Sequence, residues 1–496
     1  MTTHDIAHPV RLPHRSRQGV VMGMDGWQLT CVAIAAVIIL ISVNRFGPPG
    51  LLYGAPLYLP LGAFAFISIH NDSGPRQLGL WVMKQVRHAV GATKHTFRPE
   101  RSHVVGTLNL PGIRASVQLW ELDGTACVYN PHDRSVSVTA EVGVEGFLMK
   151  DVPERFDLAQ QWSPVLASFT QRPGIKRAVL QERTIPTTIR AARDHYQEVA
   201  TRRDLDAASP VARNYEAVMD GSERFAVSHR NYVTFTLDLI TLSPQLKSLG
   251  GGEQAIKALA SLEAKNLDDA LRAARISVRR WLSPRDVAAL ARITFDPKFA
   301  ANVQNRPDRD AGVDISAIGP MYLEEPRGKN GVVYSDSGVH STMWIHEWPR
   351  SDAAVGFVEP IVFARTPGTG EPITHIFSIV LTPVSVKKAI KRIEDDKKVW
   401  RGNEVLRAKR GRDGSAADAA DWEALERQEE EIVAGHGEFR YGAYLTISAP
   451  DEAALDEASA GMRNALARAG MEPQILYCQQ AEALMVNALP IGLGMK

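Results

Sequence analysis

The stretch Trp27-Gln-Leu-Thr-Cys-Val-Ala-Ile-Ala-Ala-Val-Ile-Ile-Leu-Ile-Ser-Val43 is uncharged and almost entirely apolar. A helix of this length extends about 25 Å at 1.5 Å per residue, close to the minimum that crosses a bilayer. A second uncharged run, Leu51 to Ile69, follows the turn Asn44-Arg-Phe-Gly-Pro-Pro-Gly50. Its prolines and glycines are tolerated because neighbouring helices satisfy the freed backbone groups. Residues 1–100 are therefore predicted to form a membrane anchor with transmembrane helices at about 27–43 and 51–69.

Basic residues flank this pair of runs on both sides, whereas the turn between them has only Arg45. The flanking residues are Arg11, Arg15, Arg17, Arg76, Lys84, Arg87, Lys94, Arg98 and Arg101. The positive-inside rule then predicts a multi-pass inner-membrane protein with both termini in the cytoplasm. A secretory signal peptide and a buried apolar hairpin are competing interpretations. The long leader and the lack of a small-residue cleavage site argue against the signal peptide.

An amphipathic helix is predicted just after the second run, at residues 78–90. Its apolar side carries Leu78, Trp81, Val82, Val86 and Val90. A basic amphipathic helix beside a membrane span can lie on anionic lipid. It can equally dock on the soluble part of the chain, and the sequence leaves both interpretations open.

The overall composition of the chain is that of an ordinary globular protein. The chain has 496 residues, 45% hydrophobic and 23% charged, which is enough for two or three soluble units. A net charge of +1 gives no general argument for nucleic-acid binding. The widely spaced Cys31, Cys127 and Cys478 allow neither a disulfide framework nor a zinc motif.

The region 101–320 is predicted to be a cytoplasmic β-rich and helical domain. Alternating or β-branched residues at 103–110, 115–120, 126–129 and 135–140 indicate a β-meander or small barrel. Further expected elements are helices at 154–171, 187–220 and 253–277, strands at 178–181 and 232–242, and a helix capped by Ser283. The Pro-, Gly- and Asp-rich residues 300–330 mark its boundary with the last domain.

Residues 321–496 predict an α+β domain. Strands are expected at 341–348, 358–364, 375–381, 440–448 and 474–478, with a helix at 451–468. Residues 385–434 form a long helix pair, basic at first and acidic later, that ends at Gly435-His-Gly437. The order of elements predicts a ferredoxin-like layer with this helical hairpin inserted in its first crossover.

No catalytic motif is present. There is no P-loop, since Gly328-Lys329 lacks the upstream glycine and is followed by Asn330. His346-Glu347 has Arg350 where a metalloprotease motif needs its second histidine. No nucleophile elbow occurs. The sequence therefore predicts a protein that is not an enzyme, with no catalytic, cofactor-binding or metal-binding residues and no cofactor.

Two segments resemble known families. Trp27-Gln28, the short inter-run turn, Leu80-Trp81-Val-Met-Lys-Gln-Val86 and Phe97-Arg98-Pro99 are similar to the PrgI-like two-helix membrane subunit of type IV secretion systems. The rest resembles the N-terminal, non-ATPase part of the type IV secretion ATPase. The stretches that carry this likeness are Arg279–Leu290, Ile345–Pro349, Glu430–His436, Tyr444–Ala449 and Ala488-Leu-Pro-Ile-Gly492. Such a fusion resembles the membrane proteins of actinobacterial conjugative elements.

The resemblance implies a structural subunit of a conjugation or secretion machine that acts through protein–protein interaction. Its expected partners are the lipid bilayer, a separate cytoplasmic P-loop ATPase, other membrane channel subunits and a second copy of the chain, with no direct nucleic-acid contact. Strand edges and the 385–434 helix pair are the expected docking surfaces. Two alternatives stay open: a type VII secretion component resembling EccE, and a membrane-bound enzyme of unknown chemistry.

Overall fold

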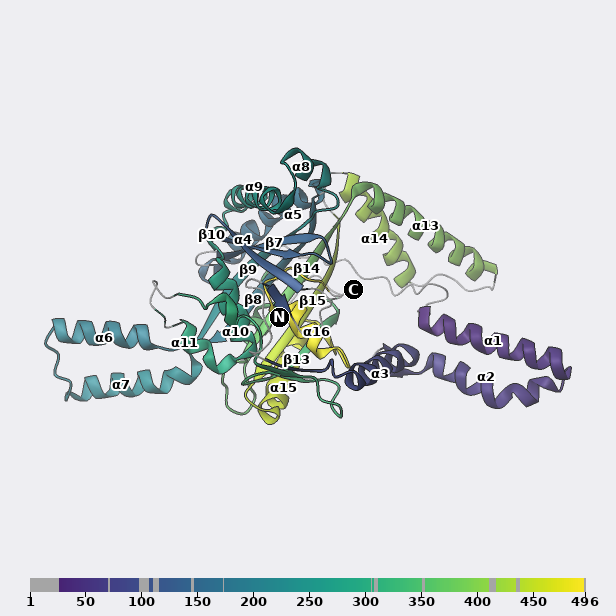
Figure 1. The fold of residues 1–496 in the computed structure, drawn as a ribbon, viewed down its shortest axis with the longest axis horizontal. Helices are drawn as coiled ribbons and strands as arrows, with labels where there is room; N and C mark the ends of the chain where they lie inside the picture. Colours follow the sequence, from purple (N-terminus) through teal and green to yellow (C-terminus); the bar gives the residue numbers. More distant parts are fainter. Residues whose placement is uncertain are drawn as a thin grey trace.

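The computed structural model describes residues 26–69, 72–97, 107–109, 116–143, 147–172, 174–304, 306, 311–349, 353–409, 416–433 and 438–494. It is an α+β fold in which a 14-stranded antiparallel sheet forms the body and an apolar helical hairpin lies at one end (Figure 1). A small hairpin of β1 (Ser68–Ile69) and β2 (Asp72–Ser73) is separate from this sheet.

The first half of the sheet, unit 1, has seven strands. These are β4 (Thr107–Asn109), β5 (Ser116–Leu122), β6 (Thr125–Asn130), β7 (Ser135–Gly143), β8 (Ile175–Pro186), β9 (Val227–Asp238) and β10 (Ser277–Trp281). Their order is β4-β5-β6-β7-β9-β8, and β10 pairs with the part of β7 that β6 does not reach. The expected meander is thus confirmed for β5 to β7. It continues into the large sheet and closes no barrel.

The second half, unit 2, also has seven strands. These are β3 (Lys94–Thr96), β11 (Tyr322–Glu324), β12 (Val333–Tyr334), β13 (Val339–Glu347), β14 (His375–Val384), β15 (Glu438–Ala449) and β16 (Glu472–Ile475). Their order is β3-β11-β12-β13-β15-β14, with β16 beside β12 on β13. Unit 2 therefore repeats the strand order of unit 1. The units join where β8 pairs with β14, for example Gln181 with Ser378.

Each unit inserts a helical hairpin between its second and third long strands. The short arm is α6 (Arg190–Arg202) with α7 (Pro210–Ser222), and the long arm is α13 (Val386–Lys409) with α14 (Ala416–Val433). The flanking strands are paired up to the arm, at Pro186–Val227 and at Val384–Glu438. Each arm thus replaces a hairpin turn, so the expectation that the long pair lies in a crossover was wrong. The short arm projects at the end opposite the apolar hairpin (Figure 1).

Helices cover both faces of the sheet. One face carries α4 (Val152–Gln160), α5 (Trp162–Gln171), α8 (Ser243–Ser248), α9 (Gly252–Ala273), α12 (Glu359–Val362) and α15 (Glu452–Arg468). The other carries α10 (Pro284–Phe295), α11 (Ala300–Gln304) and α16 (Gln480–Ala488). Ile379 packs against the apolar cores of both units on the first face. The two cores therefore form one continuous apolar layer between the sheet and the helices of that face. Ser283 and Asp286 cap α10 reciprocally, as the Ser cap predicted.

One other expectation needs correction, and one helix was missed. Residues 358–364 form α12 and turns rather than a strand, because Pro360 suits the first turn of a helix. Helix α16 was not predicted at all. Gly435-His-Gly437 and the basic residues Arg11, Arg15, Arg17, Arg98 and Arg101 lie outside the described residues.

Candidate functional site

The apolar hairpin consists of α1 (Gly26–Phe46) and α2 (Gly50–Phe66). By length and composition α1 can cross a membrane, whereas α2, with 17 residues, is apolar but shorter. Ser42 Oγ donates to Gly50 O at 2.6 Å, and a Cβ added to Gly54 would lie 2.8 Å from Ser42 Oγ. Small residues therefore let the two helices approach closely, as they do in membrane helix pairs.

Helix α3 (Gly74–Ala89) connects this hairpin to unit 2 through a buried cation. The Lys84 side chain is fully buried, and its Nζ donates to Lys329 O at 2.6 Å and to Asn330 Oδ1 at 2.9 Å. Burial lowers the pKa of Lys84, and the Glu325 carboxylate, 4.0 Å away, opposes that shift. Three partners thus replace the water that the ammonium group loses.

Arg87 adds a second link on the same side of α3. It lies 3.7 Å from the buried Glu325 carboxylate and donates to Cys478 O, two residues before α16. Strand β3 follows directly and pairs with β11. From the sequence alone, Lys84 and Arg87 were identified only as basic residues that flank the apolar runs. Their partners lie more than 230 residues away, so no local pattern could identify these contacts.

The interface between the units is also polar. Arg183 on β8 is fully buried, and its guanidinium donates to Thr294 Oγ1 at 2.9 Å and to Ala488 O, the last carbonyl of α16. Cations are stabilised at helix C-termini, and an unpaired carbonyl there would be costly. Burial lowers the pKa of Arg183 to about 10, so it stays charged at neutral pH. Arg183 therefore connects α10 of unit 1 with α16 of unit 2.

The C-terminal segment 487–492 crosses from unit 2 to unit 1. Asn487 donates to Thr446 Oγ1 at 2.8 Å in unit 2, and Gly492 O accepts from Thr236 Oγ1 at 3.1 Å in unit 1. Gly492 has φ +63°, and an added Cβ would lie 2.2 Å from Thr236 Oγ1. The Leu-Pro-Ile-Gly stretch thus closes the joint between the units, and its glycine is required by this close approach.

A carboxylate flanked by two imidazoles lies across the same joint. Glu182 is 3.1 Å from His229 Nδ1 and 3.4 Å from His375 Nε2. Burial lowers the pKa of His375, which therefore stays neutral at pH 7. In the part of the chain that the structure describes, no group of three His, Cys, Asp or Glu could hold a metal ion. The cluster links β9, β8 and β14 rather than forming a metal centre.

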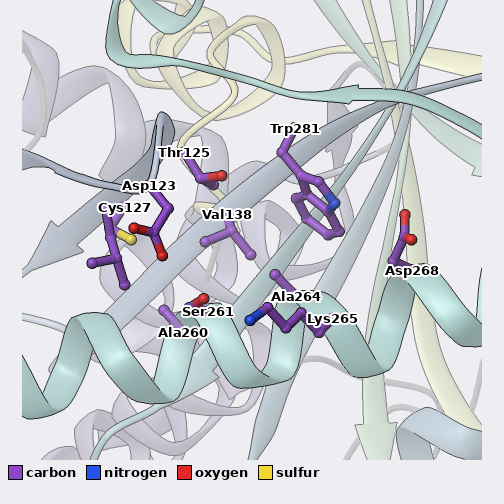
Figure 2. Close-up of a pocket in the computed structure, with 11 residues that line it drawn as sticks. Asp123, Thr125, Cys127, Val138, Ala260, Ser261, Ala264, Lys265, Asp268 and Trp281 are labelled. Carbon is purple, nitrogen blue, oxygen red and sulfur yellow. The ribbon is translucent and has the colours of Figure 1, made fainter.

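A cavity of about 210 Å³ lies between α9 and the strands of unit 1 (Figure 2). Burial raises the pKa of Cys127 in its wall to about 11, so this thiol is not an activated nucleophile. Figure 2 shows Asp268 on the opposite side of the view from Asp123 and Cys127. These side chains do not converge as an acid, a base and a nucleophile would have to.

The long arm is held together by its own contacts. Lys397 Nζ is 2.5 Å from Glu429 Oε2, and the rings of Trp400 and Trp422 are 4.7 Å apart. Lys397 and Arg401 also lie over the Trp422 ring, at 5.5 and 5.4 Å. Since the two helices are antiparallel, the basic α13 faces the acidic end of α14. This pairing explains the charge order of 385–434.

At the base of the long arm, Arg392 pairs with Glu438 on β15, while Ala389, Ile393 and Ile432 form a small core. The arm is thus attached near the sheet and folded on itself beyond it. It is the most prominent of the expected docking surfaces. Among the described residues, β3 and β4 are the outer strands of the sheet, with three residues each.

No protein-family model matches the chain, and no curated protein matches it.

Proposed function

We propose that this chain is a non-catalytic inner-membrane subunit of a type IV secretion or conjugation-like machine that docks a separate P-loop ATPase. In this proposal α1 and α2 both cross the membrane, and both termini are cytoplasmic. The basic residues around the hairpin, against the lone Arg45 in its turn, support that orientation. The sequence resemblance supplies the class of machine.

The observation that carries the docking proposal is the long arm. It extends from the sheet as a pre-folded helical pair with charged and aromatic side chains, and its base is fixed by Arg392 and Glu438. A rigid arm loses little conformational entropy when a partner binds it. The body behind it is fixed to the hairpin through Lys84, so a docked motor would be held at the membrane.

The strand order favours this reading over the type VII alternative. The orders β16-β13-β15-β14 and β10-β7-β9-β8, all antiparallel with crossing helices on one face, support a ferredoxin-like layer in each unit. The order of elements in residues 321–496 predicted such a layer for unit 2. The sequence has no phosphate-binding loop, so hydrolysis would come from the partner chain.

The test is co-purification of the full chain from membranes, compared between two shortened arms. In one variant residues 398–428 are replaced by a short Gly-rich turn, because Lys397 and Glu429 are already paired there. In the matched control residues 194–219 are replaced in the same way between Arg193 and Asp220, which are 2.7 Å apart. We expect a P-loop ATPase to co-purify with the full chain and the control, and to be lost with the first variant. A partner set without a P-loop ATPase, or one that the first variant leaves unchanged, would overturn the proposal.

A further inference from the structure

Helix α3 docks on the body with its polar side and leaves its apolar side uncovered. Lys84 and Gln77 are buried, whereas Leu78, Val82, Met83, Val86 and Val90 are 46–75% exposed. At 100° per residue these five apolar residues fall on one arc of the helix. A helix on the surface of a soluble protein shows the reverse arrangement, so this arc needs an apolar partner.

The position of the arc indicates which partner covers it. The Gly74 amide donates to Ile67 O at 2.7 Å, so the first residue of α3 lies beside the C-terminal end of α2. A Cβ added to Gly79 would lie 3.8 Å from the Trp27 ring at the start of α1, and one added to Gly74 would lie 3.0 Å from the Phe64 ring. The exposed apolar surface of α1 and α2 therefore continues onto α3.

The aromatic residues fit the same boundary. Trp27 and Trp81 are both about half exposed, one at the start of α1 and the other on α3. Tryptophan is enriched where hydrocarbon meets water, because the ring is apolar and its N–H can face the headgroups. Arg76, at the edge of the arc, is about half exposed and pairs with Asp72 at 2.7 Å, so a headgroup phosphate would have to share its guanidinium with that carboxylate.

We propose that the apolar arc of α3 lies in the lipid headgroup region, so that α3 is an interfacial helix. Its opposite side holds unit 2 through Lys84, Arg87 and Glu325, and the helix thus sets the orientation of the body on the membrane. This inference rests on the proposed membrane hairpin, but it does not depend on an ATPase partner.

The test uses spin labels on the full chain in nanodiscs of mixed neutral and anionic lipid. Single cysteines replace Val86 on the arc, Val37 in α1 and Val211 on the short arm, all three exposed. Cys31 is first replaced by Ser, while Cys127 and Cys478 are buried and react slowly. Collisions of each label with apolar oxygen and with a water-soluble nickel complex are then compared.

We expect the ratio of oxygen to nickel collisions to be several-fold higher at positions 86 and 37 than at position 211. A label at 86 that collides freely with nickel while 37 does not would overturn the inference and leave the membrane hairpin standing. A label at 86 shielded from both reagents would show that a protein surface covers the arc, which also overturns it. Free nickel access at 37 would instead contradict the membrane hairpin itself.

Discussion

The two units share a strand framework but differ in almost everything that connects it. Strands β7 and β13 have nine residues each, and β9 and β15 have 12 each. Among the described residues between the first two long strands, unit 1 has α4 and α5, whereas unit 2 has the four-residue α12. Among the described residues, Lys84 and Arg87 link α3, and with it the apolar hairpin, to unit 2. The two units therefore share their hydrogen-bonded strands and differ in the segments that connect them.

The two units also differ in the side-chain contacts between their first and third long strands, which are β7 and β9 in unit 1 and β13 and β15 in unit 2. In unit 1 hydroxyl pairs join them, Ser137 with Thr236 at 3.0 Å and Thr139 with Thr234 at 2.9 Å. In unit 2 Thr342 and Thr446 form such a pair, but His340 contacts Ser448 at 2.8 Å. Unit 2 thus has a titratable group in a contact that unit 1 makes with neutral ones.

Replacing Arg183 by Met should have the largest effect, because this residue connects the units. The substitution leaves Ala488 O and Thr294 Oγ1 without their charged donor in the buried joint. Because each unsatisfied buried polar group costs about 1–3 kcal/mol, we expect a loss of roughly 2–5 kcal/mol of unfolding free energy, with unit 1 and unit 2 unfolding at separate urea concentrations. Hydrogen exchange followed separately in β7 and β13 would detect that separation.

The matched control is Lys176→Met on the same strand. Lys176 is paired with Asp133 at 2.8 Å and is about a quarter exposed. Its loss should cost less than about 1 kcal/mol and leave a single transition. Equal effects of the two substitutions would show that the units are not joined through Arg183.

The second prediction concerns acid stability, in which the units should differ. Burial lowers the pKa of His340 to about 4, from 6.5 in the unfolded chain. The native state therefore binds fewer protons, so its stability is full above pH 6.5 and falls as the pH drops towards 4. The loss should reach about 3 kcal/mol at pH 4. Urea denaturation across this range would measure it.

His340→Asn should remove most of this pH dependence, because the amide can still donate and accept but does not titrate there. His132→Asn in unit 1 is the control, since His132 is exposed. If the pH profile of His340→Asn matched that of the unaltered chain, the assignment of this acid sensitivity to His340 would be wrong.

The smallest expected effect compares the two arms. The Lys397–Glu429 pair is partly buried, whereas Arg193 and Asp220 are more exposed. A double-mutant cycle should give a coupling of about 0.5–1 kcal/mol in the long arm and about 0.3 kcal/mol in the short one. Local hydrogen exchange of the arm amides is the measurement. A stronger coupling in the short arm would contradict the expectation that the more buried pair is the stronger one.

Local sequence patterns predicted most individual elements. The apolar residues of α9 recur at helical spacing, and the Ser283 cap fixed the start of α10. The long strands β13, β14 and β15 were found within a few residues of their ends. These elements carry their signal in adjacent residues, so no tertiary information was needed.

The features that failed or were missed depend on contacts between distant residues. Helix α16 is buried on all sides, so it has no amphipathic period to detect. The short apolar run at 358–364 fits a strand and a buried helix equally well. The repeated strand order has no visible sequence repeat, and the partners of Lys84 and Arg183 are set only by the fold. The contacts that join α3 to unit 2 and unit 1 to unit 2 therefore cannot be predicted from local sequence patterns.

The pairing of β3 with β11 has a consequence for synthesis. Thr96 leaves the ribosome long before Tyr322, its partner in the sheet. At 5–20 residues per second the delay is about 10–45 s. During this interval α1 to α3 have been made, yet Lys84 and Arg87 still lack Glu325. The proposed anchor therefore has time to form before the body, and Lys84 and Arg87 gain their Glu325 partner only when residues 322–330 emerge.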